Sequence, residues 1–245
     1  MSDRAAGTEP DLSKDAVARY AFLADLMIGR QPPPLDLVEL GAAPGDQIAG
    51  LAERGYRATA VDLGLASDAW ADGREGRMAE LLAGAGVALV EWNLEDEPYP
   101  LPDESFDVVV MTEVFEHLRE YPIRSLQESI RILRPGGHLY FTTPNSAYLG
   151  NRLRLARGAS VYTPLPDWVS GLPHARHARE YTFDEITELM ERTGFTVVVS
   201  TSRHFHVDSG RQGVARPLKV AMNTVARMRP TFGPCIVMVA RKPLA

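Results

Sequence analysis

Short apolar runs alternate with helical stretches along most of the chain, and this alternation constrains the fold more than any other feature. We interpret the runs at 35–40, 58–63, 87–92, 106–111 and 138–143 as strands. They are β-branched or almost continuously apolar, as expected for parallel strands that are covered on both faces. Further strands are expected at 195–202 and 235–242, the last forming an antiparallel hairpin at the sheet edge. The pattern therefore predicts an α/β fold with a doubly wound sheet, mostly parallel with an antiparallel edge strand, and helices on both faces.

Helix signals separate these strands. Residues 15–30 are amphipathic and precede three prolines, which cannot continue a helix. Residues 122–134 repeat apolar side chains at helical spacing, and Thr182 with Glu185 predicts a capping box for a later helix. We expect a disordered segment at 1–12 and a single domain at 13–245. This domain carries an irregular insertion at about 146–180, interpreted as a lid or substrate loop, and a basic segment at about 203–230.

Composition limits the classes of protein. The 245 residues are 45% apolar and 24% charged, which suffices for one ordinary core. A single cysteine, Cys235, rules out a disulfide framework, and no run suits a membrane span or signal peptide, so we expect a cytoplasmic protein. The net charge of −6 makes a nucleic-acid partner unlikely.

Two segments, 146–181 and 203–230, are locally basic. They form either solvated surface or a rim that attracts an anionic substrate or an acidic membrane face. An apolar stripe at 214–228 predicts a helix that packs on the sheet, on a membrane or on a second copy in a homodimer.

The segment LDLVELGAAPGD at 35–46 reads as a buried strand that enters a glycine turn and opens a helix. The predicted sheet is Rossmann-like, and in an open parallel sheet of this kind the ligand binds at the carboxyl ends of the strands. Gly41 and Gly45 let the backbone approach a ligand, and Asp62, at the end of the next strand, is placed to accept hydrogen bonds from ribose hydroxyls. Purely structural turns also use glycine.

The other residues of the turn select the ligand. A pyrophosphate site favours G-x-G-x-x-G with free N–H groups, whereas Ala43 and Asp46 take glycine places here and Pro44 has no N–H. Asp46 would also repel phosphate. A nicotinamide reductase is therefore disfavoured. A ligand with adenosine, a ribose and cationic groups but no phosphate fits better, and S-adenosylmethionine is such a ligand.

ELGAAPGD resembles the first motif of the class I S-adenosylmethionine-dependent methyltransferases, and ATAVDL resembles the second. The resemblance continues through EWNLEDEPYPLPDESFDVVVMTEVFEHL and ILRPGGHLYFTTPN, from about residue 35 to 195. The resemblance implies that the cofactor residues are Tyr20, Glu39, Gly41, Ala43, Gly45, Asp62, Asn93, Leu94, Thr112 and Glu113. The first motif departs from the family pattern at Ala43, where a glycine is usual, and this narrows the cleft slightly.

The residues TEVFEHL follow the fourth strand. On a helix, Glu113, Glu116 and His117 would share one face at the strand end where the methyl group is transferred. The stretch resembles the E-x-x-E-H of ubiquinone-type O-methyltransferases and of small-RNA 2′-O-methyltransferases. The latter have a further histidine, and HAREYT puts His177 in that place. The resemblance thus implies a divalent-metal site at Glu113, Glu116, His117 and His177. Without metal, we expect catalysis by His117, His177 and Glu116, with a histidine as general base.

The insertion should select the acceptor. It offers stacking surfaces and hydrogen-bond donors for a small-molecule substrate of anionic or glycosylated character: Tyr148, Arg152, Tyr162, Trp168 and His174. A D/N-P-P-Y/F sequence is absent after the fourth strand, which disfavours base amines. The leading hypothesis is methylation of a sugar or secondary-metabolite hydroxyl during biosynthesis. The alternatives are a metal-assisted 2′-O-methyltransferase of RNA ends and a cofactor-binding inactive partner protein.

Overall fold

The computed structural model of the chain describes residues 14–63, 74–162, 165–170, 176–205, 221, 224–226 and 228–244. The predicted disordered segment at 1–12 lies outside these residues, as does most of the basic segment at 203–230.

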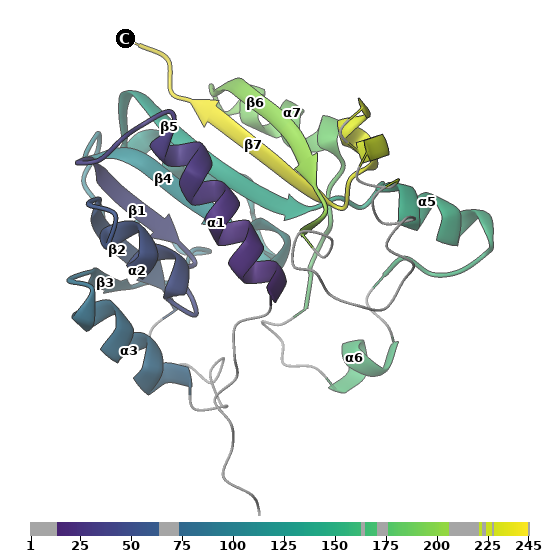
Figure 1. The fold of residues 1–245 in the computed structure, drawn as a ribbon, viewed down its shortest axis with the longest axis horizontal. Helices are drawn as coiled ribbons and strands as arrows, with labels where there is room; N and C mark the ends of the chain where they lie inside the picture. The colour runs from purple at the N-terminus through teal and green to yellow at the C-terminus, as the bar shows by residue number, and fades with distance from the viewer. Residues whose placement is uncertain are drawn as a thin grey trace, which may run out of the picture.

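Seven strands form one sheet in the order β3-β2-β1-β4-β5-β7-β6 (Figure 1). The strands are β1 (Asp36–Leu40), β2 (Arg57–Asp62), β3 (Ala88–Glu91), β4 (Phe106–Thr112), β5 (Leu133–Pro144), β6 (Thr196–Arg203) and β7 (Cys235–Arg241). Strands β1 to β5 pair in parallel, whereas β7 is antiparallel to both β5 and β6. The predicted doubly wound sheet is confirmed. The strand that runs against the others is β7, which lies one place inward from the edge, between β5 and the edge strand β6.

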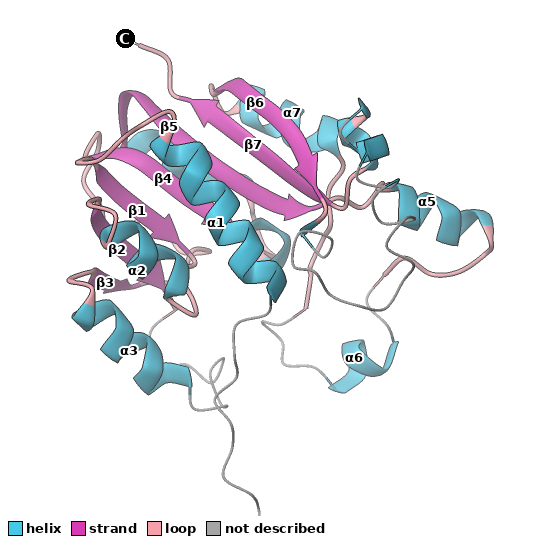
Figure 2. Cartoon of the chain, viewed as in Figure 1, coloured by secondary structure: helices cyan, strands magenta, loops and turns pink. Residues whose placement is uncertain are grey.

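The helices cover both faces of this sheet (Figure 2). They are α1 (Lys14–Ile28), α2 (Asp46–Ala52), α3 (Arg74–Gly84), α4 (Ile123–Ile132) and α7 (Phe183–Arg192). Because successive side chains of a strand point to opposite faces, β4 feeds two separate cores. Val108 and Val110 pack with α1, α2 and α3. Val109 and Met111 pack with α4 and α7.

Local signals set several helix ends. The predicted capping box of α7 is present: the Thr182 hydroxyl accepts a hydrogen bond from the Glu185 N–H, and the Glu185 carboxylate accepts one from the Thr182 N–H. The prolines after α1 end that helix near the predicted place. Sheet pairing extends β5 beyond its predicted start, so that it begins at Leu133, directly after α4.

The insertion after β5 contains α5 (Leu149–Ala156) and α6 (Leu165–Ser170), which project from the layered body (Figure 1). Two short 3-10 helices, η2 (Phe115–His117) and η4 (Pro230–Phe232), follow β4 and precede β7. Among the described helices, none has the length and apolar character needed to cross a bilayer.

Candidate active site

The glycine turn between β1 and α2 is built around Gly41 and Gly45, which have φ angles of 74° and 96°. A Cβ atom on Gly41 would lie 2.4 Å from Cγ2 of Val114. Glycine is therefore needed here for two reasons: it permits the left-handed backbone, and it leaves the space that Val114 of the loop after β4 occupies. Gly45 is the N-cap residue of α2. The turn thus packs directly against the segment after β4, which carries the candidate catalytic residues.

Asp62 ends β2 and lies 9% exposed against this turn. Its Oδ2 accepts a hydrogen bond from the Ala43 N–H at 2.9 Å, and its Oδ1 accepts one from the Leu63 N–H at 2.8 Å. Burial raises the pKa of Asp62, and these backbone donors oppose that effect. Each carboxylate oxygen can accept a further hydrogen bond, so Asp62 can hold the turn and bind a ribose hydroxyl at the same time.

Glu39, the fourth residue of β1, is 2% exposed, and its Oε2 has no hydrogen-bond partner among the described residues. Burial raises the pKa of Glu39 well above its ordinary range, and the charge of Asp62 raises it further. Gln47 on α2 accepts a hydrogen bond from Thr112 Oγ1 at 2.9 Å, while its own buried Nε2 has no donor contact within the described residues. An unsatisfied acceptor and an unsatisfied donor fit a ligand that carries both an ammonium and a carboxylate.

Asp46 is not the isolated charge that we expected from the sequence. Arg77 on α3 binds it through two hydrogen bonds, of 2.9 and 2.7 Å. Asp46 therefore contributes less to phosphate exclusion than the sequence indicated, since the arginine offsets its charge. Pro44, which has no N–H, and the buried acids Glu39 and Asp62 are what disfavour a phosphate ligand here.

The helix α1 contributes Tyr20 and Arg19 to this region. Burial and the charge of Glu39 raise the pKa of Tyr20 to about 12, which places the phenol near that carboxyl. Arg19 Nη1 lies 3.8 Å from Glu113 Oε2, and its buried Nε has no partner among the described residues. We did not predict Arg19 from the sequence. Its adjacency to Tyr20 was the available signal, but amphipathic helices commonly carry arginines.

The predicted adenine contacts, Asn93 and Leu94, follow β3. Asp62 pairs with Glu91 in the sheet, so Asn93 lies two residues beyond the partner of the ribose candidate. The Asn93 side chain accepts a hydrogen bond from the Glu95 N–H, and Leu94 is 8% exposed. These positions lie at the same edge of the sheet as Asp62.

The segment after β4 differs from the prediction of one helix face. Only Phe115 to His117 are helical, and Glu113 precedes them with a left-handed φ of 56°. Thr142 Oγ1 donates to Glu113 Oε1 and Thr143 Oγ1 donates to Glu116 Oε2, each at 2.9 Å. Because successive residues of β5 point to opposite faces, the two glutamates are held by threonines on different faces of that strand. Within the described residues, the group of possible metal ligands contains Glu116 but not Glu113, which differs from the predicted set.

Glu113 instead faces α1 and β7. Besides Arg19, it accepts a weak hydrogen bond from Cys235 Sγ at 3.5 Å. Burial raises the pKa of this thiol well above its ordinary range. Cys235 is thus a buried neutral thiol whose surroundings include a carboxylate.

Glu116, His117 and His177 come together on the other side. The imidazole rings of the two histidines have centroids 4.9 Å apart, and their planes meet at 83°. Glu116 is 1% exposed, and its Oε1 lies 4.0 Å from His117 Nε2 without a hydrogen-bond partner among the described residues. Burial and the charge of Glu113 raise the pKa of Glu116 well above its ordinary range. One ligand atom from each of the three side chains fits within 4.8 Å, close enough to hold a metal ion.

Each histidine is oriented through Nδ1. His117 Nδ1 lies 3.2 Å from the carbonyl oxygen of Arg176, and His177 Nδ1 lies 2.8 Å from Glu180 Oε1. The Ala178 N–H donates to the Glu116 carbonyl at 2.6 Å, which fixes the end of the insertion onto η2. Glu180 was not among the predicted site residues. Its place three residues after His177 was a weak signal for a carboxylate that orients the ring.

The predicted substrate residues lie in different surroundings and do not form one group. Trp168 on α6 lies under the guanidinium of Arg176, whose Cζ is 5.1 Å from the ring centroid, and the carbonyl of the same arginine contacts His117. Arg152 is bound to the Ala147 carbonyl at 2.5 Å and stacks on Phe232. Tyr148 is the N-cap residue of α5, and Tyr162 is 84% exposed. His174 lies outside the described residues.

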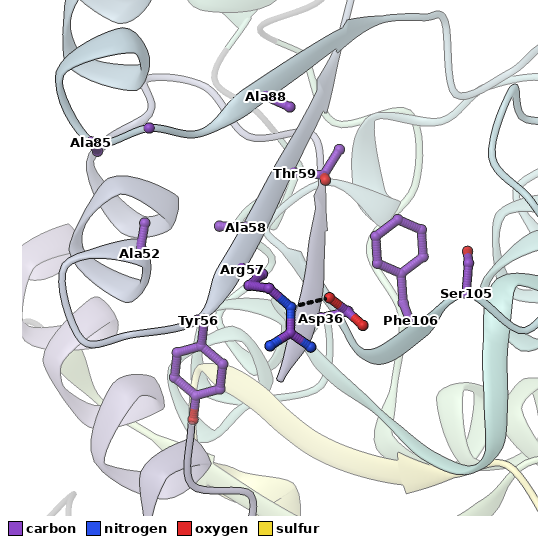
Figure 3. Close-up of a pocket in the computed structure, with 11 residues that line it drawn as sticks. Asp36, Ala52, Tyr56, Arg57, Ala58, Thr59, Ala85, Ala88, Ser105 and Phe106 are labelled. Atoms are coloured by element: carbon purple, nitrogen blue, oxygen red, sulfur yellow. Dashed lines mark hydrogen bonds and ion pairs between the residues drawn. The ribbon is translucent and has the colours of Figure 1, made fainter. Parts of the chain in front are cut away.

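A hollow on the surface lies at the amino ends of the parallel strands (Figure 3). It is lined by Asp36, Arg57, Ala88 and Phe106, the first residues of β1, β2, β3 and β4. The charges are paired, since Arg57 binds Asp36 at 2.6 Å. This hollow is separate from the residues described above, which lie at the carboxyl ends.

The sheet is Rossmann-like, and the buried acids at its carboxyl ends suit an adenosyl cofactor without phosphates. A family model described as a methyltransferase domain matches residues 11–200. The chain belongs to this family, as a class I S-adenosylmethionine-dependent methyltransferase.

Relatives agree with this assignment, and a solved structure shares the fold. The probable S-adenosylmethionine-dependent methyltransferase of Mycolicibacterium smegmatis is 34% identical over 73% of this chain and 56% of its own length. The malonyl-acyl-carrier-protein O-methyltransferase of Methylococcus capsulatus is 36% identical over 54% of this chain and 46% of its own. The chain therefore spans about half the length of these relatives. The structure of a Burkholderia thailandensis 1,6-didemethyltoxoflavin N1-methyltransferase with S-adenosylhomocysteine has a TM-score of 0.57 and 20% identity over 95% of this chain and 80% of that one.

Proposed function

We propose that the protein transfers a methyl group from S-adenosylmethionine to an oxygen of a small molecule, a sugar or secondary-metabolite hydroxyl. The observation that carries this proposal is the pair of histidines, His117 and His177, beside Glu116 after β4. In this displacement the new O–C bond forms as the C–S bond breaks, and S-adenosylhomocysteine leaves. Alignment supplies most of the acceleration, and the hydroxyl proton passes to a nearby base.

The cofactor would bind at the carboxyl ends of β1 and β2, beside the buried acids Glu39 and Asp62. Asp62 would accept from the ribose hydroxyls, and Asn93 and Leu94 would border the adenine. Glu39 favours the ammonium and the sulfonium, because a buried carboxylate attracts positive charge strongly. The Arg19 guanidinium, which lies beside Glu113, would bind the carboxylate of the cofactor. Its buried Nε is a suitable donor for this contact.

Either histidine suits the role of general base. A carbonyl oxygen only accepts hydrogen bonds, so in the neutral ring His117 donates through Nδ1 to Arg176 and keeps the lone pair on Nε2. Glu180 has the same effect on His177. Both rings thus have a basic Nε2, and the carboxylate of Glu180 would also stabilise a positive charge on His177.

The oxygen acceptor is supported by the Methylococcus relative, whose name describes an O-methyltransferase. Trp168 and Arg176 form a stacked pair of an aromatic ring and a guanidinium, and the carbonyl of Arg176 contacts His117. These groups suit an aromatic or glycosylated acceptor that bears a phosphate or a carboxylate.

Calorimetry with S-adenosylhomocysteine and with NAD tests the cofactor, and the proposal requires binding of the first alone. A screen of hydroxylated acceptors with labelled S-adenosylmethionine then tests the reaction. Transfer to amines alone would contradict the oxygen acceptor. Binding of the cofactor with no transfer to any acceptor would instead favour the inactive partner protein.

A metal-assisted 2′-O-methyltransferase of RNA ends is the second candidate. It is favoured by one observation, the convergence of Glu116, His117 and His177 within 4.8 Å. Two imidazoles and one carboxylate would suit Mn²⁺ or another borderline divalent ion. Our proposal predicts that a chelator leaves turnover unchanged and that Mn²⁺ gives no binding heat. Loss of activity with the chelator, restored by Mn²⁺ in the wild type but not in Glu116→Ala, would favour the metal-dependent enzyme.

A further inference from the structure

The insertion after β5 concentrates exposed apolar side chains. Of the twelve large apolar side chains that are exposed in the described part of the chain, six lie within residues 153–169. They are Leu153 (47% exposed), Leu155 (58%), Tyr162 (84%), Leu165 (72%), Trp168 (47%) and Val169 (71%). Single exposed apolar residues are common, but a concentration of this kind marks a surface that contacts something other than water.

The same segment is positively charged. No acidic residue occurs between Glu128 and Asp167 in the sequence. Arg154 and Arg157 are exposed at the end of α5, and no carboxylate within the described residues forms an ion pair with either. The chain as a whole carries a net charge of −6. An anionic surface would therefore repel most of the molecule and attract this part of it.

We infer that α5 docks on an anionic lipid bilayer, with its leucines in the interface and its arginines at the headgroups. Leucine, tryptophan and arginine are the residues that interfacial segments use, because arginine can keep its charge among headgroups while its stem is buried. Leu153 and Leu155 are about 200° apart around the helix axis. One protein face would cover only one of them, whereas lipid surrounds an inserted helix end on all sides.

The position of α5 links this docking to the site. The helix begins five residues after Pro144, the end of β5, and Thr142 and Thr143 of that strand hold Glu113 and Glu116. In Figure 1, α5 and α6 extend beyond the ends of the parallel strands. Docking would thus bring the mouth of the site to the interface. Resting on the proposed function, this makes the acceptor an amphiphile that is methylated at the bilayer surface.

Co-sedimentation of the full chain with vesicles tests the docking. We expect binding to vesicles of phosphatidylcholine with phosphatidylglycerol, no binding to phosphatidylcholine alone, and release by high salt, which screens exposed charges. Arg154→Glu combined with Arg157→Glu should weaken binding at least about tenfold, since each arginine near an anionic surface contributes a several-fold attraction. The matched control, Arg54→Glu combined with Arg192→Glu, reverses two exposed arginines elsewhere and should bind as the wild type.

Leu153→Ser combined with Leu155→Ser should also lose vesicle binding, whereas Val198→Ser, on β6, should keep it. All variants should bind S-adenosylhomocysteine as the wild type does, which shows that they fold. Equal binding to neutral and anionic vesicles, or normal binding by the double arginine variant, would overturn the inference. So would absence of vesicle binding together with arginine-dependent binding to polyglutamate, which would indicate an acidic protein partner. Failure of the wild type to bind S-adenosylhomocysteine would contradict only the proposed function.

Discussion

His177 Nδ1 and Glu180 Oε1 lie 2.8 Å apart, and this contact fixes the ring that faces His117 across 4.9 Å. The two histidines come from distant parts of the chain, one after β4 and the other at the end of the insertion. Their Nδ1 atoms are both occupied by acceptors, so both rings have a basic Nε2 in the neutral form. The reaction therefore has two possible bases within one small region.

We predict that the two histidines can be distinguished by substitution. The acting base should lose about 10²- to 10⁴-fold in kcat when it is replaced by alanine, because proton removal by a positioned side chain contributes an effect of this size. Affinity for S-adenosylhomocysteine should not change in His117→Ala or His177→Ala. Steady-state kinetics with labelled cofactor measures both variants and their combination. Full turnover in the double variant would remove the base from the mechanism.

Asp62 should be needed for cofactor binding and, to a smaller extent, for stability. Asp62→Ala removes the acceptor for two backbone N–H groups as well as the candidate ribose contact. We expect at least about tenfold weaker binding of S-adenosylhomocysteine, since hydrogen bonds to a charged group contribute about 1.5–3 kcal/mol. Calorimetry measures the affinity and thermal unfolding the stability. Asp25→Asn, an exposed aspartate on α1, serves as the control, and unchanged affinity in Asp62→Ala would contradict the assignment.

Arg19 should recognise the carboxylate of the cofactor. Arg19→Gln is expected to weaken the binding of S-adenosylhomocysteine about tenfold, because a charge-assisted hydrogen bond is lost. A cofactor analogue without the carboxylate provides the control, since it should bind the wild type and Arg19→Gln equally. If the substitution weakens both ligands to the same extent, Arg19 acts on the fold of α1 and not on the carboxylate.

The stability of the cofactor-free protein should fall as the pH rises. Burial raises the pKa of Glu39 well above its ordinary range, so the folded protein keeps a proton that the unfolded chain has lost. The stabilisation from this group is complete below the unfolded value of about 4.3 and is lost as the pH rises towards the folded value. Glu39→Gln cannot ionise and should show a smaller loss between pH 5 and pH 8.

Thermal unfolding across that range measures the effect. Glu53→Gln, which changes an exposed side chain, should follow the wild type. If Glu39→Gln and the wild type lose the same stability between pH 5 and pH 8, the proton is not held at Glu39.

Much of the cofactor half of the site could be predicted from the sequence. The glycine turn and Asp62 are read from short segments, because a buried parallel strand, a left-handed glycine and a terminal acid each leave a local signature. The ordered motifs from residue 35 to 195 then fix the family. Asp46 shows the limit of such reading, since its partner Arg77 lies on α3 and nothing local indicates the pairing.

The acceptor half depended on the tertiary structure. Spacing alone puts Glu113 and Glu116 on one helix face, but the backbone after β4 takes a left-handed turn and only three residues are helical. Thr142 and Thr143, more than twenty residues later, each bind one of the two carboxylates from a different face of β5, because neighbouring side chains of a strand point in opposite directions. Such contacts leave no periodic pattern in the sequence.

By itself, the sequence determined the parallel sheet, the capping box of α7 and the glycine turn at the proposed cofactor site, since these follow from residue type and spacing over a few positions. Only the tertiary structure decided that Arg19 lies beside Glu113, that Glu113 is not part of the group of Glu116, His117 and His177, and that Glu180 orients His177. Those relationships join segments that are remote in sequence or whose local backbone departs from a regular helix, and their geometry is set when the sheet and its covering helices pack together.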